Sequence, residues 1–322
     1  MLVDSAYVIA GLVLLFFGGE ALVRGSVAIA ERMGISKLIV GLVIVGFGTS
    51  APELLVSLQA ALDGAPDISI GNVVGSNIAN VLLVIGLAAA IAPVANTDRS
   101  LRRDLVVVVA SAAFACALFL TGEIGRLSGL ALVAGLTAYL GYSVFAERRR
   151  RKLAQGTLDE ADVVPGAEAG GLTEKPLIAG LAVLGGIAAL VFGARLLVTG
   201  ATGIARDFGV SEAVIGLTIV AIGTSLPELA TALVAAVKRE AEVVLANVVG
   251  SGIFNVLCIL GITALIAPIP VAERFAYMDG PIMLAISALA ALFLWYRDRI
   301  GRLVGASMLV VYGAYIAVQN AL

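Results

Sequence analysis

Two glutamates lie in the middle of long apolar stretches, where an ionised carboxylate is costly. Glu53 and Glu228 end the segments GTSAPE and GTSLPE. Placing an ionised carboxylate at the centre of a membrane helix costs about 2.5 to 3.5 kcal/mol or more. Neither glutamate has a Lys or Arg within one helical turn, so a bound cation is the natural partner. We therefore predict that the two carboxylates bind an ion together and are not merely structural charges.

The proline before each glutamate makes additional oxygen atoms available. Because Pro52 and Pro227 lack an N–H group, the carbonyls four residues earlier, at Gly48 and Gly223, lose their helical donors. Irregular backbone at membrane depth is tolerated only where it is buried in protein or lines a cavity. A simple proline kink is the alternative, but a kink needs none of the hydroxyl groups found here, on Thr49, Ser50, Thr224 and Ser225.

Two other segments each place a serine and an asparagine on one helix face. Ser76 and Asn80 are four residues apart, so both side chains point to the same side of a helix. Ser251 and Asn255 repeat this spacing. Hydrogen bonding between helices is the alternative role for such side chains, but beside two glutamate-bearing breaks we favour ion ligation. Asn72 and Asn247 lie about two helical turns before Asn80 and Asn255. For these two residues a structural role and a ligand role are equally consistent with the spacing.

The donor set contains carboxylates, amides, hydroxyls and carbonyls, with no sulfur or imidazole. Oxygen ligands suit hard cations: Ca²⁺ accepts about six to eight of them in flexible geometry, whereas Mg²⁺ demands a tighter octahedron. Na⁺ also accepts such oxygens. Two glutamates together carry two negative charges, which one Ca²⁺ or two Na⁺ would neutralise. Competition between these ions for one site is a physical basis for exchanging them.

The composition shows that these residues belong to an integral membrane protein. Of 322 residues, 60% are hydrophobic and 14% are charged, and the mean hydropathy is +1.06, whereas soluble domains are about 25% charged. With no His and only Cys116 and Cys258, the sequence offers no zinc site, disulfide framework or His-based catalysis. We therefore expect no enzymatic activity, no cofactor and no nucleic-acid partner. The first apolar segment lacks a cleavage site and is expected to remain as a membrane helix.

The apolar stretches predict an all-α polytopic membrane protein with ten transmembrane helices. Each stretch is long enough to cross about 30 Å of hydrocarbon, which takes roughly 20 residues. A strand barrel is excluded because its strands alternate in polarity over about 10 residues. The ten stretches are 5–24, 38–62, 68–93, 104–121, 126–146, 176–200, 212–237, 243–268, 276–296 and 302–320.

A polar interval at residues 147–175 divides the ten helices five and five. We predict a first five-helix repeat at 1–146 and a second at 176–322, joined by this loop. The loop opens with a basic run, which favours the cytoplasm; recognition of lipid headgroups is the alternative. Both termini then lie outside the cytoplasm. This threading places 17 of the 21 basic residues on the cytoplasmic side, a bias that makes the reversed orientation hard to defend.

The two halves of the chain are duplicates of one another. Residues 34–53 align without a gap on residues 209–228 and match at 11 of 20 positions, and the same offset matches residues 70–93 to 245–268 at 14 of 24 positions. We call this the repeat alignment. The shared residues include Thr, Ser, Pro, Glu, Asn and Gly, so the match is not mere apolar similarity. Because five helices is an odd number, the second copy runs inverted in the membrane. Transporters built this way bind substrate near the midplane, where the repeats meet.

At these residues the sequence resembles the cation/Ca²⁺ exchanger superfamily, and most of all the prokaryotic Na⁺/Ca²⁺ exchangers. The resemblance rests on the segments Gly-Thr-Ser-x-Pro-Glu and Gly-Ser-x-x-x-Asn, present in both halves. It implies an antiporter in a prokaryotic plasma membrane, with Ca²⁺ and Na⁺ as substrates and no protein partner. It also implies that the first and sixth helices slide across the other eight. The candidate metal ligands are Glu53, Glu228, Asn80, Asn255, Thr49, Thr224, Ser50, Ser225, Ser76, Ser251, Gly46 and Ala221.

One position departs from the superfamily pattern. Several sodium-type members carry Asp where this chain has Asn255, so this half has one fewer titratable carboxylate. Proton-coupled relatives tend to carry Gly-Asn-x-x-Glu in place of Gly-Thr-Ser-x-Pro-Glu, which favours Na⁺ over H⁺ here. Exchange of H⁺ for Ca²⁺, or of another divalent cation, is the nearest alternative. A passive cation channel is the alternative from a different class.

A separate set of charges lies in the predicted first and sixth helices. Glu20 and Arg24 are four residues apart, and the repeat alignment places Glu20 opposite Arg195. We interpret these residues as charges near helix ends that pair or extend toward the membrane surface. A role in gating is the alternative.

Overall fold

The protein is a bundle of long apolar helices. By length and apolar composition, seven of the described helices can cross a membrane, and a bent helix pair between residues 41 and 62 can form an eighth span. The ten-span count stays a prediction. The helix α7 carries Arg102, Arg103 and Asp104 in its first turn, and part of the predicted stretch 212–237 lies outside the described residues. This computed structural model describes residues 1–33, 40–95, 101–155, 176–209, 221–297 and 299–321.

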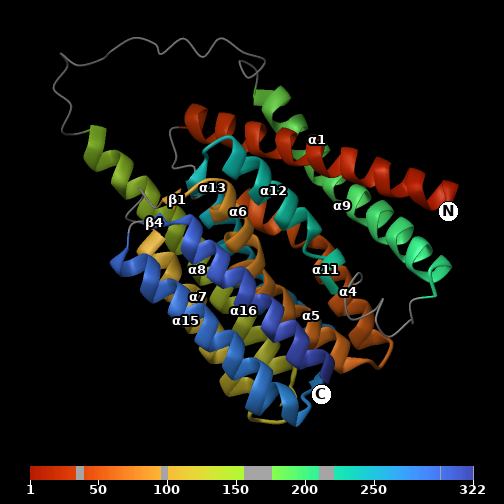
Figure 1. The fold of residues 1–322 in the computed structure, drawn as a ribbon. Coiled ribbons are helices and arrows are strands. Elements are labelled where there is room, and N and C mark those ends of the chain that lie inside the picture. The colour runs from red at the N-terminus through yellow and green to blue at the C-terminus, as the bar shows by residue number, and fades with distance from the viewer. Residues whose placement is uncertain (34–39, 96–100, 156–175, 210–220, 298, 322) are drawn as a thin grey trace.

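The two longest helices, α1 (Leu2–Met33) and α9 (Pro176–Asp207), run side by side (Figure 1). Both extend beyond the apolar stretches that predicted them, and the added turns stay in contact with the neighbouring helix: a Cβ atom added to Gly25 would lie 2.9 Å from the carbonyl oxygen of Ala179. Glu20 and Arg195 therefore lie well inside helices, which contradicts the interpretation of them as charges near helix ends, whereas the expected ion pair between Glu20 and Arg24 is present.

Glycines seven residues apart bring α1 and α9 to backbone contact. A Cβ atom added to Gly18 would lie 3.0 Å from the carbonyl oxygen of Gly186, and one added to Gly11 would lie 2.8 Å from that of Gly193. The order of these contacts reverses along the second helix, so the helices are antiparallel. Small residues allow membrane helices to approach this closely. The two helices therefore pack as one unit.

We expect Gly186→Leu to push α1 away from α9 and to lower the thermal stability of the purified protein. A Cβ atom there would meet the backbone of Leu22 at 2.7 Å, and overpacking of this kind costs about 1 to 3 kcal/mol. Gly185→Leu is the matched control, because nothing lies within 4 Å of its added Cβ atom. Equal melting temperatures for the two variants in detergent would show that the glycine contact contributes nothing.

Both glutamates follow a helix break. In the first half, a π-helical segment (Gly41–Gly46) and α3 (Phe47–Thr49) lead into α4 (Ala51–Leu62) with a bend of 46°. Ser50 caps α4 with φ −82° and ψ 5°. In the second half, α11 (Ala221–Gly223) precedes α12 (Leu226–Val237), and its cap, Ser225, has nearly the same angles, −86° and 7°. The breaks predicted from the prolines are therefore present.

The long helix that comes next in each half, after α4 and after α12, contains a wider π-helical turn in its middle. Such turns are frequent at functional sites. The second of these helices lies at the centre of the bundle, since every residue of Val243–Phe254 is buried. In chain order the segments are α5 (Pro66–Ala79), π-helical Asn80–Val84 and α6 (Ile85–Ile91), then α13 (Ala241–Phe254), π-helical Asn255–Leu260 and α14 (Gly261–Ile266).

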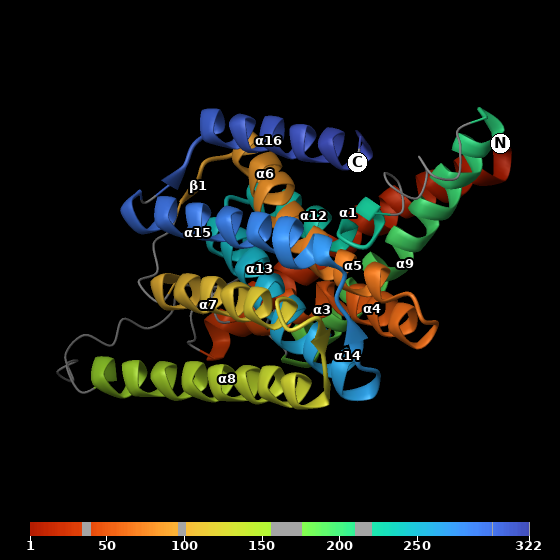
Figure 2. The ribbon, with the colours of Figure 1, turned by 90° about the horizontal axis from the view of Figure 1, so that it is seen from below.

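Four more helices lie on the side of the bundle away from α1 and α9, where Figure 2 shows α8, α7, α15 and α16 in succession. The helix α8 continues through the basic run assigned to the loop, because Glu, Arg and Lys favour helix. The remainder of the predicted loop 147–175 lies outside the described residues. The bounds are α7 (Leu101–Phe119), α8 (Arg126–Gln155), π-helical Phe275–Asp279, α15 (Gly280–Tyr296) and α16 (Arg302–Ala321).

Two short antiparallel strand pairs join the halves. The strand β1 (Val94–Ala95) pairs with β4 (Arg299–Ile300), and β2 (Glu123–Ile124) pairs with β3 (Ile269–Pro270). Each pair takes one strand from each half of the chain. Element bounds also recur: α4 and α12 begin at residues 51 and 226 and end at residues 62 and 237, which are equivalent positions in the repeat alignment.

Candidate functional site

The two break segments meet at the glutamates. Glu53 and Glu228 lie in the first turns of α4 and α12, and both side chains are completely buried. Ser50 donates a hydrogen bond of 3.1 Å from Oγ to Oε1 of Glu228, and Ser225 donates one of 3.5 Å to Oε1 of Glu53. Each carboxylate is therefore bound by the serine of the other half, which brings the two sequence motifs into one site.

Two asparagines hold the breaks in position. Asn247 accepts a hydrogen bond of 3.1 Å from Thr49 Oγ1 and donates one of 3.1 Å to the backbone carbonyl of Glu228. Asn72 accepts a 3.3 Å bond from Thr224 and donates a 3.1 Å bond to the backbone of the other glutamate. Both ends of each amide are engaged in these hydrogen bonds, so both asparagines have the structural role that the spacing left open beside a ligand role.

Two buried serines complete the hydrogen bonding. Ser251 Oγ donates to the carbonyl oxygen of Gly46 at 3.3 Å and lies 3.5 Å from Oε1 of Glu228. On the other side, Ser76 Oγ lies within hydrogen-bond distance of Ser225 Oγ, at 3.3 Å. A Cβ atom at Gly46 would lie 3.0 Å from the backbone nitrogen of Ser251. Glycine thus allows this carbonyl to approach the serine and the carboxylate.

Six buried polar atoms of the two glutamates and of Asn80 and Asn255 have no hydrogen-bond partner among the described residues. They are Oε2 of each glutamate and both amide atoms of Asn80 and of Asn255. Each asparagine begins a π-helical segment and is at most 1% exposed. A buried polar atom without a partner costs about 1 to 3 kcal/mol. The oxygens among these atoms are the donor type that a hard cation prefers, so the residues present fit a cation.

The candidate metal ligands that hydrogen-bond to one another therefore form two adjoining groups. One is built on Glu53 and the other on Glu228, and Asn80 and Asn255 lie one helical turn beyond Ser76 and Ser251. For Ala221 the structure gives only its place as the first residue of α11. Among the described residues, no group of three or more Asp, Glu, His or Cys side chains gathers in a way that could hold a metal. A cation here would rely on two carboxylates and neutral oxygens.

Two other buried carboxylates were not singled out by the sequence, although they occupy equivalent positions in the repeat alignment. Asp104 Oδ1 lies 2.7 Å from Nε of Arg103, and Asp279 Oδ2 lies 2.6 Å from Nε of Arg274. Each carboxylate is neutralised by its own arginine, so neither needs a bound cation. The glutamates have no such partner among the described residues, and this difference separates the candidate ion site from ordinary buried ion pairs.

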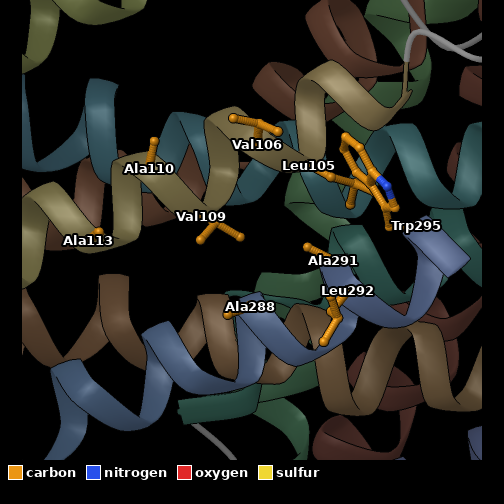
Figure 3. Close-up of a pocket in the computed structure, with 9 residues that line it drawn as sticks. All are labelled: Leu105, Val106, Val109, Ala110, Ala113, Ala288, Ala291, Leu292 and Trp295. Atoms are coloured by element: carbon orange, nitrogen blue, oxygen red, sulfur yellow. The ribbon is translucent and has the colours of Figure 1, made fainter.

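A groove between α7 and α15 is separate from this site. Figure 3 shows apolar side chains of the two helices facing one another across it, and its volume is about 380 Å³. None of the candidate ligands lines it. The lining residues are Leu105, Val106, Val109, Ala110, Ala113, Ala288, Ala291, Leu292 and Trp295.

Comparison with known proteins gives consistent matches over nearly the whole chain. The profile of the family described as sodium/calcium exchanger protein matches residues 4–145 and again residues 178–320. The inner membrane protein YrbG of Escherichia coli (strain K12) is 34% identical over 298 residues, covering 92% of this chain and 90% of that protein. The sodium/calcium exchanger MaX1 of Methanosarcina acetivorans is 32% identical over 348 residues, covering 98% of both.

A solved structure agrees with these sequence matches. The sodium/calcium exchanger from Methanococcus jannaschii superposes with a TM-score of 0.83 at 31% identity, with 98% of both chains covered. The membrane-spanning helices agree with a multi-pass membrane transporter, which is the class of protein that these matches define. This chain belongs to the sodium/calcium exchanger family. The resemblance drawn from the two motifs is confirmed.

Proposed function

We propose that this chain is a secondary antiporter that exchanges Na⁺ for Ca²⁺ across a prokaryotic plasma membrane by alternating access. The observation that carries the proposal is the pair of fully buried glutamates, each bound by the serine of the other half and each with one oxygen that has no partner among the described residues. Their two negative charges match one Ca²⁺ or two Na⁺. Ca²⁺ and Na⁺ therefore compete for the same charges, and each must leave before the other binds.

In this proposal the cation lies between Glu53 and Glu228. The amide oxygens of Asn80 and Asn255 and the backbone carbonyls of Gly46 and Ala221 contribute neutral ligands, which help to reach the about six to eight oxygens that Ca²⁺ accepts. The remaining ligands are hydroxyl groups, from Thr49, Ser50, Ser76, Thr224, Ser225 and Ser251.

We further propose that the architecture consists of two inverted five-helix repeats, 1–146 and 176–322, joined by a cytoplasmic loop at 147–175. The element bounds that recur at equivalent positions and the strand pairs that join the halves support this arrangement. An inverted pair of repeats presents the same site to either side of the membrane in turn. That geometry is what an antiporter needs.

The orientation can be tested with single cysteines. We expect Asp67→Cys and Glu123→Cys to react with an impermeant thiol reagent in intact cells, and Arg149→Cys to react only after lysis. All three residues are exposed. They are preferred to the nearby loop residues Gly64 and Gly122, whose φ angles of +74° and +79° do not suit a cysteine. Labelling of position 149 in intact cells would contradict the orientation.

The exchange itself is tested in proteoliposomes. Vesicles loaded with Na⁺ are diluted into Na⁺-free medium containing ⁴⁵Ca²⁺, with the membrane potential clamped by K⁺ and valinomycin. We expect Ca²⁺ uptake that requires internal Na⁺ and is not replaced by an imposed proton gradient. A channel would give uptake without any internal counter-ion, and a proton-coupled exchanger would respond to the pH gradient. Either result would overturn the proposal.

A further inference from the structure

The charged residues that the proposed ion site does not use form two matched sets of opposite sign. The repeat alignment places Glu20 of α1 opposite Arg195 of α9, and Asp63 opposite Lys238. Asp63 caps the C-terminal end of α4, and Lys238 caps that of α12. Each helix of the α1–α9 unit thus carries a charge opposite to the one at the end of the glutamate-bearing helix of the other half. We call Glu20 with Lys238 the first pair and Asp63 with Arg195 the second pair.

The first pair is closed. Lys238 Nζ lies 3.1 Å from Oε1 of Glu20, and both side chains are about three-quarters buried, with 26% and 24% exposed. Beside this pair α1 packs tightly on α12: a Cβ atom at Gly19 would lie 3.2 Å from Val234 and 3.3 Å from the carbonyl oxygen of Ala230. Val234 is only 8% exposed. At this end α1 covers the face of α12.

The second pair is open. Arg195 is exposed and forms no ion pair with any described acidic residue, while Asp63 accepts a 2.8 Å hydrogen bond from Gln59 on its own helix. Leu55, which aligns with the half-buried Ala230, is 55% exposed, and Gln59, which aligns with the buried Val234, is also exposed. The face of α4 that corresponds to the covered face of α12 is therefore uncovered by the described residues.

The glycine contacts between α1 and α9 connect these two observations. Because the two helices meet backbone to backbone at Gly11, Gly18, Gly186 and Gly193, one cannot move far without the other. A shift of the unit that brought α9 over α4 would draw α1 from α12. Closing the second pair would then open the first.

We propose that the first pair and the second pair are formed by positioning residues and close alternately. Each pair stabilises one of the two conformations in which the ion site opens to one side of the membrane. This rests on the alternating access of the proposed function. The structure has the first pair closed. Equivalent positions of opposite charge allow each end state to be stabilised by one ion pair, so neither state is strongly favoured. Such a balance keeps both states accessible during transport.

The test measures which face is covered, in purified protein in detergent, so it does not depend on transport or on which ion is carried. Reporter cysteines are placed at the aligned positions Ala230→Cys and Leu55→Cys, in a background with Cys116→Ala and Cys258→Ala. We expect Lys238→Gln to speed thiol labelling at position 230 and to slow it at position 55. Arg195→Gln should do the reverse. The free energy of a partly exposed ion pair corresponds to a change of about twofold to fivefold in each labelling rate.

Matched controls separate this role from general loosening. Arg24 also pairs with Glu20, but on the same helix, so Arg24→Gln should leave both rates unchanged. Lys238→Arg, and the charge swap Glu20→Lys with Lys238→Glu, should restore the parent pattern. Rates that rise at both reporters, or that do not change, would overturn the proposal. Opposite shifts without Na⁺-driven Ca²⁺ uptake would retain the alternating pairs and reject only the assigned ions.

Discussion

We expect Glu53→Gln and Glu228→Gln each to abolish Na⁺-driven Ca²⁺ uptake while the purified protein stays folded. Glutamine keeps the shape of the side chain and removes the charge. Halving the negative charge of a fully buried site leaves a divalent cation uncompensated, and in a medium of low dielectric that loss is severe. The fold is retained because removing a buried charge also removes the free-energy cost of burying it. Uptake is measured in the Na⁺-loaded proteoliposomes, and folding by size-exclusion chromatography and thermal melting.

The two variants are expected to behave alike, and this equality is itself informative. Each carboxylate accepts a hydrogen bond from the serine of the other half, so neither half holds a complete site. Glu123→Gln is the control, because this exposed glutamate of β2 lies in neither hydrogen-bonded group. Uptake near the parent rate in either buried variant would reject the site assignment.

We expect Asn255→Asp to make transport sensitive to acid pH and to monovalent cations. Asn255 is completely buried, its amide atoms lack partners among the described residues, and it lies one turn beyond Ser251, which contacts Glu228. A third carboxylate in such a place cannot remain uncompensated, so it binds either a proton or an additional cation. We therefore expect Ca²⁺ uptake by the variant to fall off at a higher pH than uptake by the parent, and to respond to added K⁺ or Na⁺.

The control for this change is Asn77→Asp. Asn77 is also buried, but its amide donates to the backbone carbonyl of Val73 on the same helix, and it belongs to neither hydrogen-bonded group at the site. We expect the control to lower the yield of folded protein without changing the ion or pH profile of what remains. Identical Na⁺, K⁺ and pH profiles for Asn255→Asp and the parent would show that Asn255 does not face the ion.

The sequence predicted the main parts of the site because those parts depend on local chemistry. A carboxylate in an apolar helix needs a partner, and a proline removes a backbone donor; both statements hold before any folding is known. The paired breaks before Glu53 and Glu228 follow from them and are present. The duplication also predicted that the two breaks would meet, since equivalent segments of inverted repeats lie near the same point.

Other features depend on packing and were out of reach of the sequence. The roles of Asn72 and Asn247 became clear only when both ends of each amide could be followed to a threonine and a glutamate backbone. The continuation of α1 past its apolar stretch depends on its contact with α9. The sequence also did not show that the first ion pair is closed and the second open, because that difference depends on which helices pack against one another.

The most direct test of the central claim is equilibrium binding of ⁴⁵Ca²⁺ to the purified protein in detergent, titrated with Na⁺. The claim is that Glu53 and Glu228 form one cation site for which Ca²⁺ and Na⁺ compete. It predicts saturable Ca²⁺ binding that Na⁺ displaces completely and K⁺ does not, and that is lost in Glu53→Gln and in Glu228→Gln but kept in Glu123→Gln. Ca²⁺ binding that persists in either buried variant, or that Na⁺ leaves unchanged, would contradict the claim.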